Sequence, residues 1–416
     1  MVFRLYSPEE IAASSIQVVR FAYRLSIVAC ILKLPGTHGK GVVTFTTQER
    51  DLFILPDRRL QDRIERLKSA WLVGLHHNWH DWSFRYNPLF DFSMAGEDDL
   101  RVSGGKEVPL VPMDACNFIP PCFMRRNEGE KFWDILYVAR AVFFKKIPEF
   151  LQIIRRLYDN GHPLRVLFLC PIPPYDRKSR KTSYRDIRRE FEALFTPEER
   201  HRFTLITFEA DYPFPLDLET LAHFYRSSKV FVHAPDDERR CRVASYAWAA
   251  GLPVVGMDCV GSLLPSELRR PPIFYRAESH ARFDEAILAA LGVPSESSSA
   301  REEATLFFSP EESLRKLLLH LRAQMERTGA AWEESSLFVE KLDIRLGRHH
   351  ADMTGPNHLR PGIAAFLDLL EDRSQWASLS GPDPERRFEN LLSTVQGEGC
   401  AGGLSRVLAR LIPTIR

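Results

Sequence analysis

Apolar and polar positions alternate in blocks between about residue 128 and residue 257. Short, almost continuous apolar runs are separated by longer segments in which apolar residues recur at helical spacing. The apolar runs predict strands at Asp134–Ala139, Arg165–Cys170, Phe203–Phe208, Val230–His233 and Pro253–Met257. The segments between them predict helices at Ile147–Tyr158, Tyr184–Phe195, Leu216–Ser227 and Arg240–Ala250. Apolar strands that alternate with helices indicate an α/β protein whose parallel sheet is covered on both faces.

The pattern is less regular on either side of this block. The N-terminal part predicts a helix at Pro8–Ile31, strands at Gly41–Thr47, Ala70–Leu75 and Val108–Pro112, and a surface loop at Asp91–Glu107. A polar connection follows residue 295, and apolar residues recur at helical spacing from Glu311 to Met325. We therefore expect domains over residues 1–127 and 128–295, followed by a helical C-terminal extension over residues 296–416.

Composition narrows the function classes. Two or three domains are expected for 416 residues. Lys and Arg number 56 and Asp and Glu 55, and this balance gives no support to nucleic-acid binding, which usually needs a basic surplus. The seven cysteines form no Cys-x-x-Cys pair, so neither a zinc site nor a disulfide framework is indicated. A reducing, cytoplasmic location fits this cysteine usage best.

The stretch from Ile16 to Leu34 is apolar but contains three basic residues, Arg20, Arg24 and Lys33. A membrane-spanning helix needs about 20 predominantly apolar residues, so these charges argue against a span. We interpret the stretch as an amphipathic helix that packs on the core. The alternative is a peripheral contact with a membrane surface.

The segment after the strand ending at His233 carries the clearest candidate chemistry. Glu238 is followed by Arg239 and Arg240 at the start of a predicted helix, which ends at a Gly-Leu-Pro turn containing Gly251. A helix N-terminus with added guanidinium groups favours an anion such as a pyrophosphate. Gly251 suits a left-handed helix C-cap. The alternative is an ordinary βαβ unit whose basic helix start is solvated.

This segment resembles the nucleotide-sugar signature of the group 1 retaining glycosyltransferases, which have the GT-B fold. The residues in register with that signature are Glu238, Ala247, Ala249, Gly251, Pro253, Val254 and Val255. A second block matches where Arg140 is followed five residues later by Lys145. In the family this Arg and Lys bind the donor pyrophosphate, where preorganised cations stabilise the charge that develops as it leaves.

The resemblance implies two Rossmann-like domains that face a cleft, with additional C-terminal helices. The N-terminal domain would then be on the acceptor side, and residues 128–295 would bind the nucleotide sugar. Glu238 would act as a catalytic residue that contacts the donor sugar, and Arg140 and Lys145 would bind the donor diphosphate. Asp211 and Gly261 are further candidate donor contacts, because each follows a predicted strand.

Two departures from the family pattern affect donor binding. Tyr246 stands where the family has a second Glu, which holds the nucleotide ribose, so Tyr246 is taken as the donor-binding residue at that place. Arg239 and Arg240 replace small residues, and they are assigned to the donor as well. Arginines at this place suggest, as a hypothesis, an acidic donor sugar.

The N-terminal half contains a cluster of histidine and tryptophan residues from His76 to Trp82. Within it, His80-Asp81-Trp82 is similar to a His-Asp-Trp stretch of starch and glycogen synthases. His80 is therefore a second catalytic candidate, because imidazole can bind a sugar hydroxyl or transfer a proton. His77 and Trp79 are candidates for acceptor binding. The alternative is a structural cluster.

Together these patterns predict a glycosyltransferase that moves a sugar from a nucleotide-sugar donor to an acceptor hydroxyl, with retention of configuration. A glycan or glycolipid acceptor and a role in polysaccharide biosynthesis follow from the family's common uses. Neither a cofactor nor a bound metal is expected. The alternative is a degenerate GT-B domain that serves as a nucleotide-sugar-binding or scaffold module.

Overall fold

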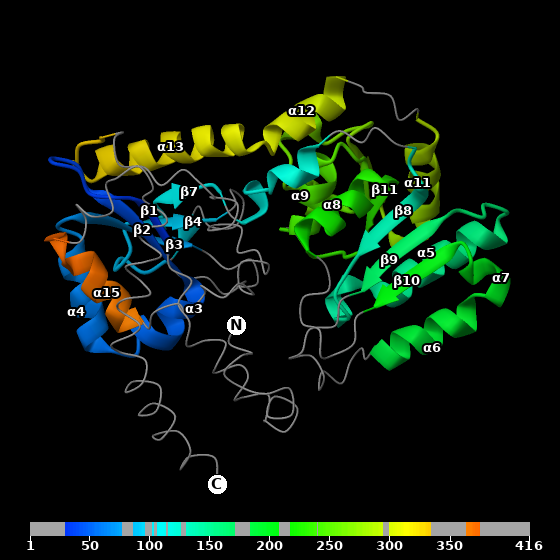
Figure 1. The fold of residues 1–416 in the computed structure, drawn as a ribbon, viewed down its shortest axis with the longest axis horizontal. Helices are drawn as coiled ribbons and strands as arrows, with labels where there is room; N and C mark the ends of the chain where they lie inside the picture. The colour runs from blue at the N-terminus through cyan, green and yellow to red at the C-terminus, as the bar shows by residue number, and fades with distance from the viewer. Residues whose placement is uncertain are drawn as a thin grey trace, which may run out of the picture. The chain divides into compact units, whose positions relative to one another are not determined.

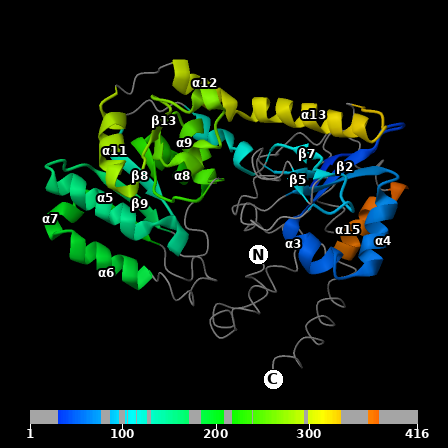
Figure 2. The same cartoon turned by 180° about the vertical axis from the view of Figure 1, so that it is seen from behind.

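The computed structural model describes residues 30–76, 86–95, 102–103, 106–113, 115–125, 130–170, 184–207, 217–238, 240–293, 299–333 and 363–374. The chain divides into two compact units (Figures 1 and 2). The first unit comprises residues 1–114 and 316–416, and the second comprises residues 115–315. The sequence placed its boundaries after residues 127 and 295, whereas the structural division falls after residues 114 and 315.

The second unit contains a six-stranded, all-parallel sheet with the strand order β10-β9-β8-β11-β12-β13. The strands are β8 (Trp133–Val138), β9 (Val166–Cys170), β10 (Phe203–Thr207), β11 (Ser228–His233), β12 (Val254–Gly256) and β13 (Phe274–Arg276). Counted from β8, this is the 3-2-1-4-5-6 order of the Rossmann fold. The predicted α/β class is therefore confirmed. All five strands predicted here are confirmed to within two residues at each end, and β13 was not predicted.

Helices cover both faces of this sheet (Figure 1). One face carries α5 (Ile147–Asp159), α6 (Tyr184–Leu194) and α11 (Phe283–Leu291). The other carries η4 (Pro121–Met124), α8 (Leu218–Arg226), α9 (Arg242–Ala249) and α12 (Ser299–Phe307). Along β8, Ile135 and Tyr137 belong to the first core cluster and Leu136 to the second. This alternation explains why the strands are apolar at almost every position.

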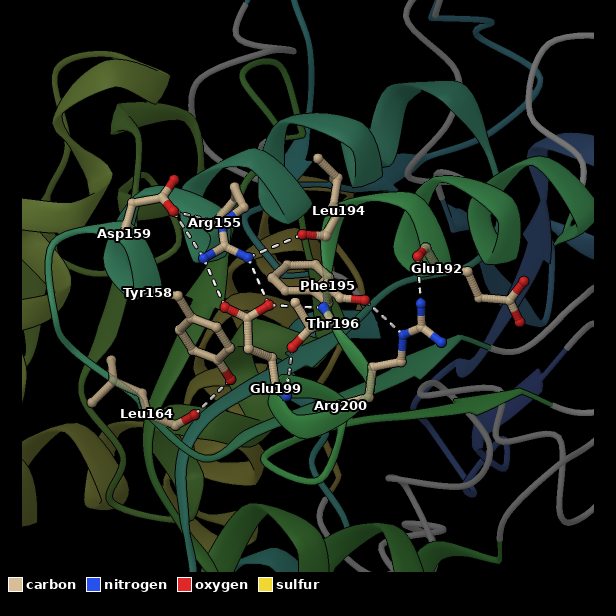
Figure 3. Close-up of polar contacts among 10 residues, drawn as sticks. All are labelled: Arg155, Tyr158, Asp159, Leu164, Glu192, Leu194, Phe195, Thr196, Glu199 and Arg200. Carbon is tan, nitrogen blue, oxygen red and sulfur yellow. Dashed lines mark hydrogen bonds and ion pairs between the residues drawn. The ribbon is translucent and has the colours of Figure 1, made fainter.

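A polar network fastens α5 to the short helix α7 (Pro197–Arg200), as Figure 3 shows. The Arg155 guanidinium donates to both carboxylate oxygens of Glu199 at 2.8 Å, and to the Leu194 carbonyl at 3.0 Å. Glu199 also closes a capping box with Thr196 at the start of α7. The hydrogen bond from Arg155, followed by that from the Thr196 backbone, lowers the pKa of Glu199 to about 2.

The first unit contains a five-stranded sheet in the order β1-β2-β3-β4-β7, in which only β1 is antiparallel to its neighbour. The strands are β1 (Cys30–Lys33), β2 (Gly41–Thr46), β3 (Trp71–His76), β4 (Phe92–Met94) and β7 (Leu110–Val111). Helix α4 (Arg58–Leu67) and helix α15 (Ile363–Glu371) pack on its core through residues such as Ile64 and Phe366. Helix α13 (Pro310–Arg327) contains the boundary between the two units, which falls after residue 315.

The remaining elements of both units are short. They are α3 (Thr47–Glu49), η2 (Arg50–Ile54), β5 (Val102–Ser103), β6 (Lys106–Glu107), η3 (Ala115–Asn117), η5 (Phe143–Lys145), α10 (Asp258–Gly261), η7 (Ser266–Leu268) and η8 (His280–Arg282).

Two predictions for the N-terminal half need correction. The loop expected at Asp91–Glu107 is wrong, because β4 lies within it, between β3 and β7, and its side chains are fully buried. The helix expected at Pro8–Ile31 is wrong at its end, where Ile31 lies in β1; residues 1–29, including most of the stretch considered for membrane contact, lie outside the described residues. Within the described ranges, no helix combines the length and apolarity that crossing a bilayer requires.

The hairpin loop between β1 and β2 binds a carboxylate from the segment that follows α13. The backbone N–H groups of Thr37 and His38 donate to Glu333 at 3.1 and 2.6 Å. A Cβ atom on Gly36 would lie 1.6 Å from Glu333 Oε2, so only glycine leaves room for this contact. Beside the loop, the fully buried Lys33 donates from Nζ to the carbonyl groups of Leu34 and Lys40.

Candidate functional site

The strand order of the second unit changes direction between β8 and β11, which are neighbours in the sheet. After β8 the chain enters α5 on one face, and after β11 it enters α9 on the opposite face. In sheets of this type, ligands bind outside the carboxyl ends of the strands at such a switch point. Two turns border this point, residues 139–146 after β8 and residues 234–238 after β11.

The turn after β8 carries two consecutive lysines. Lys145 ends the 3₁₀ helix η5, and Lys146 has a left-handed conformation with φ 54° before α5 begins. Non-glycine residues seldom adopt this conformation, which concentrates at functional and tightly constrained sites. Tyr137, a buried residue of β8, fixes the position of this turn. Its hydroxyl donates to the Lys145 carbonyl, and its ring stacks on Phe150 with a centroid distance of 3.9 Å.

Lys145 forms a buried ion pair with Glu238. Its Nζ atom donates to Glu238 Oε2 at 2.6 Å and also contacts Oε1. The two side chains are only 8% and 7% exposed. Removing water from both charges offsets much of their attraction, whereas removing either partner would leave an uncompensated buried charge. The residues assigned by resemblance to the donor diphosphate and the donor sugar are thus each other's partners here.

His233, the last residue of β11, lies between Glu238 and Cys241. Its Nε2 atom is 3.5 Å from Glu238 Oε2, and its Nδ1 atom is 3.4 Å from Cys241 Sγ. Burial lowers the pKa of His233 to about 4; the Glu238 charge opposes this shift and the Lys145 charge adds to it. Burial also raises the pKa of the Cys241 thiol well above its usual range. Around neutral pH the imidazole is therefore neutral and the thiol protonated.

His233, Glu238 and Cys241 offer ligand types that zinc prefers, and one such atom from each lies within 4.8 Å of the others. However, the Lys145 ammonium contacts both oxygens of Glu238, so a cationic group already occupies the position beside the carboxylate. Moreover, the thiol and the carboxylate face different nitrogen atoms of the imidazole. We therefore interpret the group as a chain of polar contacts from thiol to imidazole to carboxylate to ammonium.

A second ion pair joins the same two turns closer to solvent. Lys146 Nζ lies 2.9 Å from Asp236 Oδ2, and these side chains are 28% and 43% exposed. The hydrogen bond that the Lys146 ammonium donates to Asp236 raises the pKa of Lys146. The turn after β11 is also tied to the segment after β13, because His280 Nε2 lies 2.8 Å from the Ala234 carbonyl oxygen.

The predicted arginines that the structure describes lie at this same edge of the sheet. Arg140 follows the end of β8 by two residues, and Arg240 precedes the start of α9 by two residues. Both are half-buried. The structure thus brings Lys145 and Glu238 into contact, and it places Arg140 on the turn after β8 and Arg240 two residues after Glu238.

Two further predicted donor contacts are packed within the core of the second unit. The Tyr246 ring is 4% exposed, stacks on Phe123 at 4.1 Å and meets Tyr225 edge-on at 6.0 Å. Gly261 ends α10 against Phe274, where an added Cβ atom would lie 2.9 Å from the ring. Tyr246 therefore packs with core side chains on the α8 and α9 side of the sheet.

The other predicted site residues are Arg239, Asp211, His77, Trp79 and His80, and all lie outside the described residues. Sequence reasoning did not select His233 or Cys241 as site residues. A polar residue that closes an apolar strand at the carboxyl edge of a parallel sheet was an available signal for His233, since ligand sites lie at that edge. Cys241 gave no comparable signal, because it lies in the predicted helix.

No protein-family model matches the chain, and no curated protein matches it in sequence. Among solved structures, the GtfA/B complex matches with a TM-score of 0.46 and 13% identity, over 64% of this chain and 55% of that chain. An alpha,alpha-trehalose 6-phosphate synthase from Burkholderia multivorans matches with a TM-score of 0.45 and 14% identity, over 66% of this chain and 71% of that chain. TarM from S. aureus matches with a TM-score of 0.42 and 11% identity, over 60% of this chain and 51% of that chain. TM-scores below 0.5 do not establish a shared fold, so the Rossmann topology is assigned from the strand order of this chain alone.

Proposed function

We propose that this chain is a GT-B glycosyltransferase that transfers a sugar from a nucleotide-sugar donor to an acceptor hydroxyl. Arg140 and Lys145 bind the donor diphosphate, and Glu238 binds the donor sugar. Preorganised cations favour departure of the diphosphate, because negative charge grows on it as the glycosidic bond breaks. Retention of configuration, a glycan or glycolipid acceptor, acceptor contacts by His77 and Trp79, and a catalytic role for His80 are part of the same proposal.

One observation supports this proposal above the others. Two residues matched to separate blocks of the family signature, Lys145 and Glu238, are 93 residues apart in sequence and in direct contact at the switch point. A cation and a carboxylate could occur at those sequence positions by chance. Their meeting where Rossmann sheets bind ligands is what the donor role requires.

The ion pair also sets the order of events on binding. Lys145 must leave Glu238 for the diphosphate to approach it, and the freed carboxylate can then accept a hydrogen bond from a sugar hydroxyl. A diphosphate is a suitable competitor, because its oxygens accept charge-assisted hydrogen bonds from an ammonium as the Glu238 carboxylate does. The diphosphate then compensates the Lys145 ammonium, and the sugar hydroxyl gives the buried Glu238 carboxylate a hydrogen bond in place of the ion pair.

A specific observation favours the second candidate, a nucleotide-sugar-binding or scaffold module. Tyr246 stands where the family's ribose-binding Glu would be, and its ring is buried among Phe123 and Tyr225. In addition, Lys145 and Glu238 neutralise each other in the free protein. A domain that had lost catalysis would tolerate both features.

Titration calorimetry with UDP, GDP and ADP, together with an assay for nucleoside diphosphate release from the matching sugar donors, separates the candidates. Binding with release supports the transferase, binding without release supports the module, and failure of all three nucleotides to bind rejects both. Lys145→Met should weaken diphosphate binding about 10- to 100-fold, the effect expected for a lost charged hydrogen bond. The matched control is Lys229→Met, because Lys229 pairs with Asp134 near the amino ends of β11 and β8 and should not affect binding.

The same assay tests the acidic-donor hypothesis for Arg239 and Arg240. A guanidinium group binds a carboxylate through two parallel hydrogen bonds, which a neutral sugar cannot accept. We therefore include UDP-glucuronic acid beside UDP-glucose, two donors that differ only in the oxidation state of the sugar's C6. Equal turnover of both, or exclusive use of UDP-glucose, would reject this hypothesis and leave the general proposal in place.

A further inference from the structure

His233 has a position that the donor roles of Lys145 and Glu238 do not explain. It is 2% exposed at the carboxyl end of β11, and none of the residues that the structure describes makes a hydrogen bond with its Nε2 atom. A buried polar atom without a partner carries a desolvation penalty, so such an atom needs an explanation. The nearest charged group is Glu238, whose Oε2 atom is 3.5 Å away, beyond normal hydrogen-bond length.

The opposite side of the ring is anchored. Cys241 Sγ lies 3.4 Å from His233 Nδ1, and the thiol is 1% exposed at the residue that caps the N-terminus of α9. We assign the protonated thiol as the donor, because a thiol sulfur is only a weak acceptor; Nδ1 is then unprotonated and the ring proton lies on Nε2, directed at Glu238. The imidazole is therefore oriented as a donor toward the carboxylate before any ligand binds.

The 3.5 Å gap has a cause, because both oxygens of Glu238 are held by the Lys145 ammonium. Once Lys145 moves to a diphosphate, Glu238 loses the ammonium group that contacts both of its oxygens. Hydrogen bonds at catalytic sites are often long in the free enzyme and shorten in the complex. A small rotation of Glu238 brings Oε2 to the waiting Nε2–H group.

We propose that His233 is a positioning residue, which holds Glu238 against the donor sugar after Lys145 has turned to the donor diphosphate. This inference rests on the proposed transfer function and extends it by one residue. His233 acts through Glu238 and does not itself meet the substrate. The donated hydrogen bond leaves the second carboxylate oxygen available for a sugar hydroxyl.

The neutral state of the ring is consistent with this role and argues against proton transfer. The groups that face the ring are Glu238, Lys145 and Cys241, and burial keeps the pKa of His233 at about 4. When Lys145 departs, the remaining carboxylate favours the protonated ring, yet the pKa must rise by about three units before half of the rings are charged at pH 7. A hydrogen bond that only positions Glu238 needs no proton transfer, so it forms whether the His233 ring is neutral or charged.

Two substitutions at one position test the proposal. The amide nitrogen of glutamine can reach the place of Nε2, whereas that of asparagine reaches only the place of Nδ1. His233→Gln should therefore keep much of the turnover, and His233→Asn should lower kcat about 10- to 100-fold with little change in the affinity for UDP, GDP or ADP. His223→Asn is the matched control on the exposed face of α8. Thermal unfolding of each variant shows whether it is folded.

A nuclear magnetic resonance experiment gives a readout that needs no turnover. In protein with ¹⁵N-labelled histidine, adding the nucleoside diphosphate that binds should shift the His233 Nε2 resonance of the wild type as Glu238 approaches. The same addition should leave that resonance unmoved in Glu238→Gln, in which the carboxylate is lost. Cys241→Ala removes the thiol that contacts His233 Nδ1 but keeps the imidazole, so it should lower kcat by a smaller factor than His233→Asn does. This variant tests the proposal if His233→Asn does not fold.

The outcomes separate this inference from the function on which it rests. If no nucleoside diphosphate binds the wild type, the proposed function fails and the inference fails with it. If the wild type binds and turns over but His233→Asn behaves like the wild type, only the inference is overturned. If the wild type binds without turnover, the resonance decides, and an unmoved Nε2 signal overturns the inference.

Discussion

The Nζ atom of Lys145 lies 2.6 Å from Glu238 Oε2 in the interior of the second unit, although the two residues come from turns after different strands. Charged residues this deeply buried occur almost only in pairs. Each side chain therefore depends on the other for its burial, and together they fasten the turn after β8 to the turn after β11. A double variant that removes both charges should therefore restore stability without restoring ligand binding.

We expect Lys145→Met to lower the free energy of unfolding by about 3 kcal/mol, because it leaves the buried Glu238 carboxylate without its counter-charge. The double variant Lys145→Met, Glu238→Gln should recover most of this loss, since neither charge remains. Urea unfolding of both single variants, the double variant and the wild type measures the coupling. Purely additive losses would show that the two side chains do not depend on each other.

Restoring the family's acidic residue at position 246 should harm the protein. Tyr246→Glu puts a carboxylate among the rings of Phe123 and Tyr225, which should lower the free energy of unfolding by about 2 kcal/mol or more. Tyr246→Phe keeps the ring and should cost only about 1 kcal/mol, the price of the hydrogen bond between the hydroxyl and Arg242. Thermal unfolding and nucleotide affinity should be compared for both. A stable Tyr246→Glu variant with tighter nucleotide binding would contradict this account.

The contact between Arg155 and Glu199 should make stability depend on pH in the acid range. The pKa of Glu199 falls from its usual 4.5 to about 2 in the folded protein, so the contact stabilises the fold fully above about pH 4.5. This contribution is lost as the pH falls from about 4.5 to 2. Since Glu199 is partly exposed, we expect Glu199→Gln to lower the free energy of unfolding by only about 1 to 2 kcal/mol at pH 7.

The measurement is urea unfolding of the wild type and Glu199→Gln at pH 7, 4 and 2.5. The difference between the two proteins should shrink as the pH falls. Arg188→Gln is a suitable control, because the exposed pair of Arg188 and Glu192 on α6 should contribute little at any pH. A difference that stays constant down to pH 2.5 would show that the Glu199 pKa is not lowered.

The carboxylate bound by the β1–β2 loop offers a paired test in the first unit. Gly36→Ala should lower the melting temperature, because the added Cβ atom would collide with Glu333. In a Glu333→Ala background, the same substitution should have a much smaller effect, since the colliding carboxylate is gone. Differential scanning calorimetry of the two single variants and the double variant checks this. If Gly36→Ala lowered the melting temperature equally in both backgrounds, its effect would not come from a collision with Glu333.

The lowered pKa of Glu333 adds a pH dependence to this contact. Hydrogen bonds from the backbone N–H groups of His38, Gly39 and Thr37 favour the ionised carboxylate. The contact therefore stabilises the fold above the usual pKa of a glutamate and is lost as the pH falls through the lower pKa of the folded protein. Glu333→Gln should remove this dependence.

Local patterns were sufficient for much of the second unit. A strand buried on both faces has to be apolar at nearly every position, so β9 and β11 are visible in the sequence without any knowledge of their neighbours. Gly251 was expected to adopt a left-handed conformation at the end of α9, and its φ of 71° confirms this. The three-residue strands β4 and β13 were missed, whereas the equally short β12 was predicted because it follows the Gly-Leu-Pro turn in an apolar run.

For the candidate site, the sequence by itself determined the residue types and their places after the strands. It named Lys145 and Glu238 through their spacing to Arg140 and to the Gly-Leu-Pro turn, since motif spacing is a local property of the chain. Only the tertiary structure decided that these two charges pair, that His233 stands behind Glu238, and that the Tyr246 ring turns into the aromatic core. The reason is physical: which side chain meets which depends on the sheet order and on the helix face that packs inward, and both arise from contacts between residues far apart in the chain.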